Sequence, residues 1–159
     1  MRILVAAVGR LKAGPERDLV ARYVERLGAA GRSLALAPVE LIEIDESRAR
    51  RAEDRKSEEA TALLRLVSGS VLVVLDERGR DDSSEGLARR IAGWRDNGAA
   101  SLALVIGGAD GLDETVRAAA DLTLSFGKLT IPHQLVRVLV VEQLYRVATI
   151  LSGHPYHRA

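Results

Sequence analysis

The chain has no cysteine and very few aromatic side chains. Phe, Trp and Tyr together make up 3% of its 159 residues. Without cysteine, neither a disulfide nor a thiolate metal site can form. So few aromatic rings cannot provide the base-stacking platform of a single-strand-binding protein, and a net charge of +1 is too small for a surface that coats nucleic acid. Any contact with nucleic acid is therefore expected to be local and dependent on shape.

The sequence also lacks an apolar run of membrane-spanning length. Its most apolar segment covers residues 135–151. Arg137, Glu142 and Arg146 interrupt this segment before the ~18 to 20 apolar residues that a bilayer crossing needs. The N-terminal segment MRILVAAVGR shows neither the apolar stretch nor the small-residue cleavage site of a signal peptide. With the absence of cysteine, these features predict a protein of the reducing cytoplasm that does not enter a membrane.

What the sequence does contain is a regular alternation of two patterns. Short apolar runs rich in β-branched residues predict strands, and the longer segments between them have helical periodicity. The alternation predicts one α/β domain over residues 1–159, with a mainly parallel sheet and helices on both faces. The expected strands cover residues 3–8, 39–44, 71–75, 102–106 and 122–124, and the expected helices cover about 15–28, 51–67, 84–97, 113–120 and the final apolar segment.

The apolar residues of the last helix spread too widely for one amphipathic stripe. The helix is therefore expected to be buried on more than one side. In one interpretation it packs on the sheet and on a second copy of the chain, so that glutamates in place of Leu139 and Leu144 would split the dimer or unfold the chain. In the other it is a central helix in the core of a monomer.

The residues that follow the strands are the first candidates for a binding site, because ligands of such sheets bind beyond the carboxyl ends of the strands. Three glycines in Gly107–Gly111 allow the backbone to approach a ligand closely. Neither the dinucleotide fingerprint nor a Walker motif is present, which disfavours a pyrophosphate ligand. Residues 75–79, 107–111 and 125–133 together suit an adenosine-like ligand. Pro132 is expected in the first turn of the last helix, with Thr130 as its cap.

Four segments give the chain a family resemblance: VLDERG, VIGGADG, KLTIPHQLVRVLVVEQLYR and GHPYHR. Together they resemble the RlmH family of SPOUT-class methyltransferases over the full length. The resemblance implies a SPOUT-type α/β knot, in which the C-terminal segment threads a deep trefoil knot, and a homodimer with the last helix at its interface. It also implies methylation of N3 of a pseudouridine in large-subunit (23S) ribosomal RNA on the ribosome, with S-adenosyl-L-methionine as the cofactor.

The same resemblance places the cofactor site in the loops after the last three strands. The sequence departs from the family where relatives often carry Ser-x-Leu-Thr, because this chain has Phe126 and Gly127 before Lys128-Leu129-Thr130. A loop that binds through its backbone would tolerate this change. A side chain at position 107 is expected to block the cofactor sterically. By position, the implied cofactor residues are Leu75, Gly107, Gly127, Lys128, Leu129, Thr130, Ile131 and Pro132.

The implied chemistry requires a deprotonated ring nitrogen. Methyl transfer from a sulfonium to an imide nitrogen is an in-line displacement in which an anion and a cation neutralise each other. A site that orients the two and excludes water should favour it. Removing the imide proton calls for a general base or for a fixed cation that favours the anion. Which residue is the base, if any, stays open from the sequence.

The C-terminal tail offers the polar side chains for this step. Tyr156 is expected to stack on the RNA base, and Arg158 to bind a phosphate or the imide oxygen. A frayed terminus is the competing interpretation. His154 and His157 have the spacing of a metal pair, but without cysteine or a third ligand no metal is expected. The predicted catalytic residues are therefore His154, Tyr156, His157 and Arg158, acting in their own chain or across the dimer.

Two other classes of function remain open at this point. A non-catalytic domain that senses a nucleotide or S-adenosylmethionine would share the glycine-rich loop, and a structural ribosome-associated dimer would share the last helix. The arginine-rich segment 48–56 is typical of a solvated helix start, although it could also contact a polyanion. His133, at the start of the last helix, could act directly or serve as a structural hydrogen bonder. Free RNA, the isolated subunit and the assembled ribosome are all possible substrates.

Overall fold

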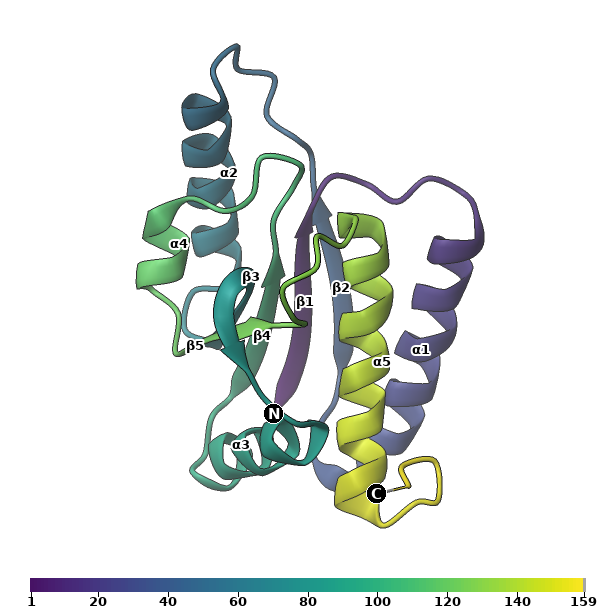
Figure 1. Ribbon diagram of the computed structural model, residues 1–159. Helices are drawn as coiled ribbons and strands as arrows, with labels where there is room; N and C mark the ends of the chain where they lie inside the picture. Colours follow the sequence, from purple (N-terminus) through teal and green to yellow (C-terminus); the bar gives the residue numbers. More distant parts are fainter. Residues whose placement is uncertain (159) are drawn as a thin grey trace.

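A five-stranded parallel sheet runs through the centre of the computed structural model, in which residues 1–158 are described (Figure 1). The strand order is β2-β1-β4-β3-β5, and every neighbouring pair is parallel. The predicted mainly parallel sheet is therefore confirmed. Strands β1 and β4, which lie inside the sheet, are buried along their apolar runs, as expected for a sheet covered on two faces. The strands are β1 (Arg2–Val8), β2 (Val39–Ile44), β3 (Val71–Asp81), β4 (Ser101–Ile106) and β5 (Leu122–Ser125).

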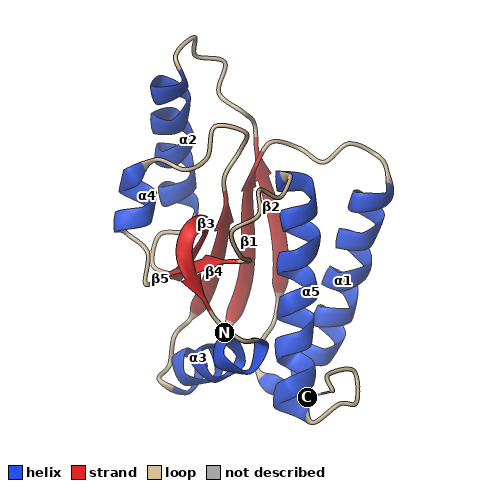
Figure 2. Cartoon of the chain, viewed as in Figure 1, coloured by secondary structure: helices blue, strands red, loops and turns tan. Residues whose placement is uncertain are grey.

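Helices cover both faces of this sheet (Figure 2). Because strand side chains alternate between the faces, Ile3 and Val5 join one apolar cluster, and Leu4 joins the other. The first cluster contains residues of α1, α3 and α5, and the second contains residues of α2 and α4. The helices are α1 (Pro15–Gly31), α2 (Ala52–Leu66), α3 (Ser84–Asp96), α4 (Glu114–Ala118) and α5 (His133–Ser152), with a 3-10 turn at Arg32–Leu34.

Strand β3 is longer than its sequence pattern predicts. The expectation that residues 75–79 form a loop after the strand was wrong, because β3 resumes its pairing with β5 beyond them. Leu75 and Arg80 both lie opposite Leu124, so residues 76–79 bulge out of the ladder between them. A Cβ atom at Gly79 would lie 2.5 Å from the backbone carbon of Leu124, so only glycine allows this approach.

The first turn of α5 also differs from the prediction. Thr130 does not cap the helix, and Pro132 is not in its first turn: Pro132 is the N-cap residue and no side chain caps the helix. The reason is the extended conformation of Pro132, with φ −54° and ψ 136°, which starts the helix at His133. At the other end, Gly153 adopts φ 68° and His154 N–H donates to the Thr149 carbonyl, which ends the helix in the ordinary glycine-dependent way.

Helix α5 runs along the length of the molecule (Figure 1). It packs beside α1, with its N-terminus near the carboxyl ends of the strands and the tail at the far end (Figure 1). Within residues 1–158, no helix has both the length and the apolar composition of a membrane span. The trefoil knot stays a prediction.

Candidate functional site

A cleft of about 410 Å³ opens at the carboxyl ends of β3, β4 and β5. Its floor contains Leu75, Ile106 and Leu124, which are all at least nine-tenths buried. The position is the one that the parallel sheet predicts for a ligand. The volume falls within the range of small-molecule sites, which is roughly 300 to 1,000 Å³.

Six of the eight predicted cofactor residues line this cleft, and they come from the three loops that the sequence singles out. Lys128 and Pro132 belong to the third loop, but both are exposed and do not line the cleft. Leu129 is 83% exposed, which is unusual for a leucine at the edge of a cleft. The six lining residues are Leu75, Gly107, Gly127, Leu129, Thr130 and Ile131.

A serine hydroxyl holds the third loop. Ser125 is 8% exposed, and its Oγ donates to the Gly127 carbonyl and accepts from the Gly127 N–H, both at 3.0 Å. Gly127 adopts φ 105°, which favours glycine. The serine at position 125 thus shapes the third loop around Gly127.

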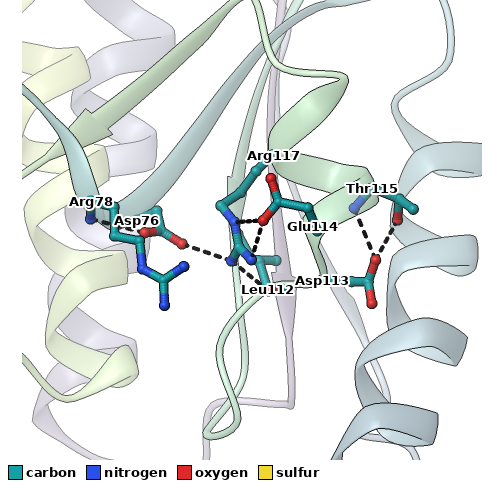
Figure 3. A network of polar contacts seen from close by, with 7 residues as sticks. All are labelled: Asp76, Arg78, Leu112, Asp113, Glu114, Thr115 and Arg117. Atoms are coloured by element: carbon teal, nitrogen blue, oxygen red, sulfur yellow. Dashed lines mark hydrogen bonds and ion pairs between the residues drawn. The ribbon is translucent and has the colours of Figure 1, made fainter.

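The polar rim of the cleft was not predicted from the sequence. Asp76 from the β3 bulge accepts from Nη1 of Arg117 at 3.2 Å and from the Arg78 N–H at 2.9 Å (Figure 3). Arg117 also donates to the Leu112 carbonyl at 2.6 Å and to Glu114 at 2.7 and 2.9 Å. The carboxylates of Glu114 and Asp76 raise the pKa of Arg117, the hydrogen bond to Glu114 most of all. The result is a fixed link from β3 to α4 along one wall.

A second ion pair fixes the glycine-rich loop. Arg55 Nε and Nη2 donate to the two carboxylate oxygens of Asp110 at 2.6 and 3.0 Å. A third nitrogen of Arg55 donates to the carbonyls of Ala49 and Arg50. The hydrogen bonds from Arg55 hold the pKa of Asp110 below its ordinary value. Arg55 therefore has a structural role within the arginine-rich segment, and Lys56 beside it lines the cleft.

The expectation that Gly107→Val would block the cofactor and leave the fold largely intact needs correction. An added Cβ would lie 2.9 Å from Cγ of Leu112 and 3.1 Å from the backbone carbon of Gly111. A valine at this position would therefore press on its own loop as well as on any ligand.

The predicted catalytic tail lies far from the cleft of its own chain. Helix α5 has 20 residues. At 1.5 Å per residue its two ends are about 30 Å apart, with the cleft at one end and the tail at the other. Of the three histidines, only His133 lines the cleft. None of the tail residues 154–158 lines the cleft of its own chain.

The Tyr156 side chain is held by contacts within its own chain, and its stacking on a base stays a prediction. Its hydroxyl donates to Glu142 Oε1 at 3.0 Å and lies 3.3 Å from the hydroxyl of Tyr23. Its ring centroid lies 4.8 Å from that of Tyr145 and 4.9 Å from the guanidinium carbon of Arg146. Burial raises the pKa of the Tyr156 phenol, and the bonds to Tyr23 and Glu142 add to this rise.

The remaining tail residues have different surroundings. His157 Nε2 lies 2.7 Å from Glu85 Oε1 of α3, and His154 Nδ1 accepts from the Tyr156 N–H at 3.1 Å. The predicted alternative of a frayed tail is therefore wrong for Tyr156 and His157, whereas Arg158 is exposed. The two histidines bind separate partners, and residues 1–158 contain no cluster of three side chains suited to a metal ion.

The chain is similar to known proteins in sequence and in fold. A family described as predicted SPOUT methyltransferase matches residues 1–157. Two relatives are named ribosomal RNA large subunit methyltransferase H. The one from Methylorubrum populi is 62% identical over 99% of this chain and 97% of its own length. The one from Xanthobacter autotrophicus is 59% identical over the whole of both chains.

Two solved structures share the fold at low sequence identity. A probable methylase family protein from Haemophilus influenzae has a TM-score of 0.55 at 12% identity, covering 99% of this chain and 70% of that one. A probable methyltransferase from Bordetella pertussis has a TM-score of 0.52 at 12% identity, covering 92% and 95%. At 12% identity, these two similarities show only a shared fold.

Proposed function

The chain belongs to the SPOUT methyltransferase family, and from this membership we propose that it transfers a methyl group from S-adenosylmethionine to N3 of a pseudouridine in large-subunit ribosomal RNA. The observation that carries the proposal is the identity of 62% and 59%, over nearly the whole chain, to relatives named for methylation of this RNA. The site of action is then the ribosome in the cytoplasm.

The residues around the cleft fit the cofactor. Leu75, Ile106 and Leu124 offer an apolar floor suited to a purine ring, and the loop backbones offer donors and acceptors for its edges. Leu129, which is 83% exposed, is an apolar side chain that a bound ligand would cover. When bound, S-adenosylmethionine supplies a methyl group activated by a positively charged sulfur.

The acceptor side of the reaction needs a group that favours the imide anion. Tyr156 is a poor general base at neutral pH, because its raised pKa keeps the phenol protonated. Arg158 carries a fixed positive charge at the exposed end of the tail, so its guanidinium suits an imide oxygen that becomes negative. His157 lies next to it. These two residues are the proposed groups that contact the substrate.

We also propose that two copies of the chain form a homodimer, in which the tail of one copy completes the cleft of the other. The support is that none of the tail residues 154–158 lines the cleft of its own chain. Leu129 and Leu135, the large apolar side chains exposed in residues 1–158, lie at the edge of the cleft and in the first turn of α5. Apolar exposure at this place suits a contact with a second copy.

The test is a methyl-transfer assay with labelled S-adenosylmethionine on free RNA, isolated large subunits and whole ribosomes. Calorimetry with the cofactor and with its demethylated product comes first. We expect both ligands to bind, and label to appear in large-subunit RNA as N3-methylpseudouridine, identified by nuclease digestion and mass spectrometry. Binding without transfer would identify a sensing domain. Absence of binding would identify a structural protein.

The matched variant for this assay is Arg158→Ala. Because Arg158 is exposed and lies beyond α5, we expect cofactor affinity and melting temperature close to those of the wild type. Methyl transfer should fall at least about tenfold, which corresponds to ~1.4 kcal/mol of lost transition-state stabilisation. Unchanged transfer would remove Arg158 from the site.

A further inference from the structure

We propose that Glu85 is a positioning residue for methyl transfer, which holds the C-terminal tail through His157 so that Arg158 meets the substrate in a defined orientation. The inference rests on the proposed function of the tail. It adds a residue of α3 that lies outside both the cleft and the tail.

The contact is short, although the Glu85 side chain is 40% exposed. Glu85 Oε1 and His157 Nε2 are 2.7 Å apart, and the side chain of His157 is 17% exposed. The other ring nitrogen, Nδ1, is buried and has no partner among residues 1–158. The carboxylate of Glu85 is therefore the polar group that fixes the direction of the His157 ring.

Glu85 is itself held firmly. It lies in the first turn of α3, where the Ser83 side chain accepts from the Gly86 N–H at 3.0 Å and caps the helix. The nearby backbone N–H of Glu85 and the Ser83 hydroxyl, together with the contact to His157, hold the Glu85 pKa below its ordinary value. The group that meets His157 is thus an anion on a rigid element, since Leu87 and Ile91 of α3 belong to the core.

The tail is consequently attached at two successive residues. Tyr156 is bonded to Glu142 of α5, and His157 is bonded to Glu85 of α3. Arg158 follows directly, is exposed, and forms no ion pair with residues 1–157. Its direction therefore depends on the two anchors before it. Loss of either anchor should widen the range of positions that its guanidinium samples.

A structural role for Glu85 predicts different results from a positioning role. An acidic residue in the first turn of a helix stabilises the helix through its dipole. If that were the whole role, Glu85→Ala would lower the melting temperature and leave the turnover number unchanged. A positioning role lowers the turnover number, because small displacements of a reacting group can cost up to about 100-fold in rate.

The experiment compares Glu85→Ala and Glu85→Gln with the wild type and with Arg89→Ala, a control on the exposed side of the same helix. The measurements are kcat and KM on ribosomes, cofactor affinity by calorimetry, and hydrogen–deuterium exchange of residues 154–158. For Glu85→Ala we expect kcat to fall about tenfold or more, with cofactor affinity unchanged and exchange in the tail faster. Glu85→Gln keeps an acceptor for His157 and should recover most of kcat. Arg89→Ala should match the wild type.

A double-mutant cycle with His157→Ala decides whether Glu85 acts through His157. We expect the double variant to be no slower than the slower single variant, because both changes release the same anchor. Fully additive losses overturn the inference, and so does a wild-type kcat or wild-type tail exchange in Glu85→Ala. If the wild-type protein methylates none of the substrates, the proposed function itself is wrong. That failure is recognisable because it does not depend on the variants.

Discussion

At the scale of single residues, Arg137 is the most consequential side chain outside the cleft. It is 1% exposed and lies in the second turn of α5. Its Nη1 donates to Glu43 at 2.6 Å and its Nη2 to the Val8 carbonyl at 2.5 Å, so it joins α5 to the ends of β2 and β1. Burial lowers the pKa of Arg137, and its Nε has no partner among residues 1–158. The sequence pattern indicates only a charged interruption of an apolar run, since Glu43 lies 94 positions away.

Arg137→Met should lower the free energy of unfolding by about 3 kcal/mol, because Glu43 and the Val8 carbonyl would lose their partner in a closed site. Urea denaturation measures this loss. Arg22→Met, on the exposed side of α1, is the control and should stay within about 0.5 kcal/mol of the wild type. Adding Glu43→Leu to Arg137→Met should restore part of the loss, because no unpaired charge then remains. A loss below about 1 kcal/mol in the single variant contradicts this account.

The ion pair between Asp110 and Arg55 should make the stability of the protein depend on pH. The pKa of Asp110 in the folded protein is below the ordinary value because Arg55 bonds it, so its contribution to stability is present above the unfolded pKa of about 4 and is lost as pH falls through the folded value. Asp110→Asn should therefore melt below the wild type at pH 6, and the difference should shrink towards pH 3. Thermal melts across this range measure it. A difference that does not change with pH would rule out the ion pair as its cause.

The ion pairs at the rim of the cleft could not be predicted from the sequence. The three loops of the cleft follow from the family resemblance, and their glycines mark them in the sequence. Asp76 and Arg117 are 41 positions apart, and Arg55 and Asp110 are 55 apart, so no local spacing connects either pair. Each pair forms only because the sheet brings the ends of β3 and β4 together with α2 and α4. Such partners require the tertiary structure.

At the scale of elements, local patterns predict most boundaries closely, and β3 is the exception. Its apolar run ends at Leu75, and the polar residues after it have the composition of a loop. They return to the sheet only because β5 offers an edge and Gly79 allows close approach. The pairing therefore depends on a strand more than forty positions away along the chain. Local sequence patterns do not include a partner at that distance.

The periodicity of α5 predicts that the helix is buried, but not which of its residues are exposed. The buried side was predicted and is confirmed, because Val140, Leu144 and Val147 are at most 2% exposed. Leu144 lies in the core of its own chain, so of the two outcomes expected for a glutamate there, unfolding applies. Leu139 is half-buried, and Leu135 is 44% exposed. The dimer face stays a prediction, and Leu135 is the better residue with which to test it.

Leu135→Glu should therefore split the dimer with little change in melting temperature, because the carboxylate stays in water in the single chain. Leu144→Glu should unfold the protein, because its carboxylate would be desolvated without a partner. Light scattering gives the mass of each variant, and circular dichroism gives its fold. A Leu135→Glu protein that remains a stable dimer would place the interface elsewhere.

At the scale of the whole molecule, the two parts of the site can be separated genetically. Arg158→Ala removes the tail function, and Gly107→Val removes the cleft, provided that melting and calorimetry show a folded protein without cofactor binding. If the tail acts across the dimer, both defects fall on one site of the mixed dimer and the other site is intact. An equal mixture should then recover about a quarter of wild-type activity, because half the dimers are mixed and each has one working site. Action within one chain predicts no recovery.

The length of α5 also has a kinetic consequence. If the tail of one copy completes the cleft of the other, as proposed, a single chain holds only half of what the reaction requires, and two chains must meet before either half is useful. The active fraction is then governed by mass action. Below the dissociation constant of the dimer, initial velocity should rise with the square of the protein concentration, and specific activity should fall on dilution. A specific activity that stays constant through dissociation, followed by light scattering, would contradict this. The amount of protein that a cell makes would then set not only how many catalysts it has but how well each one works.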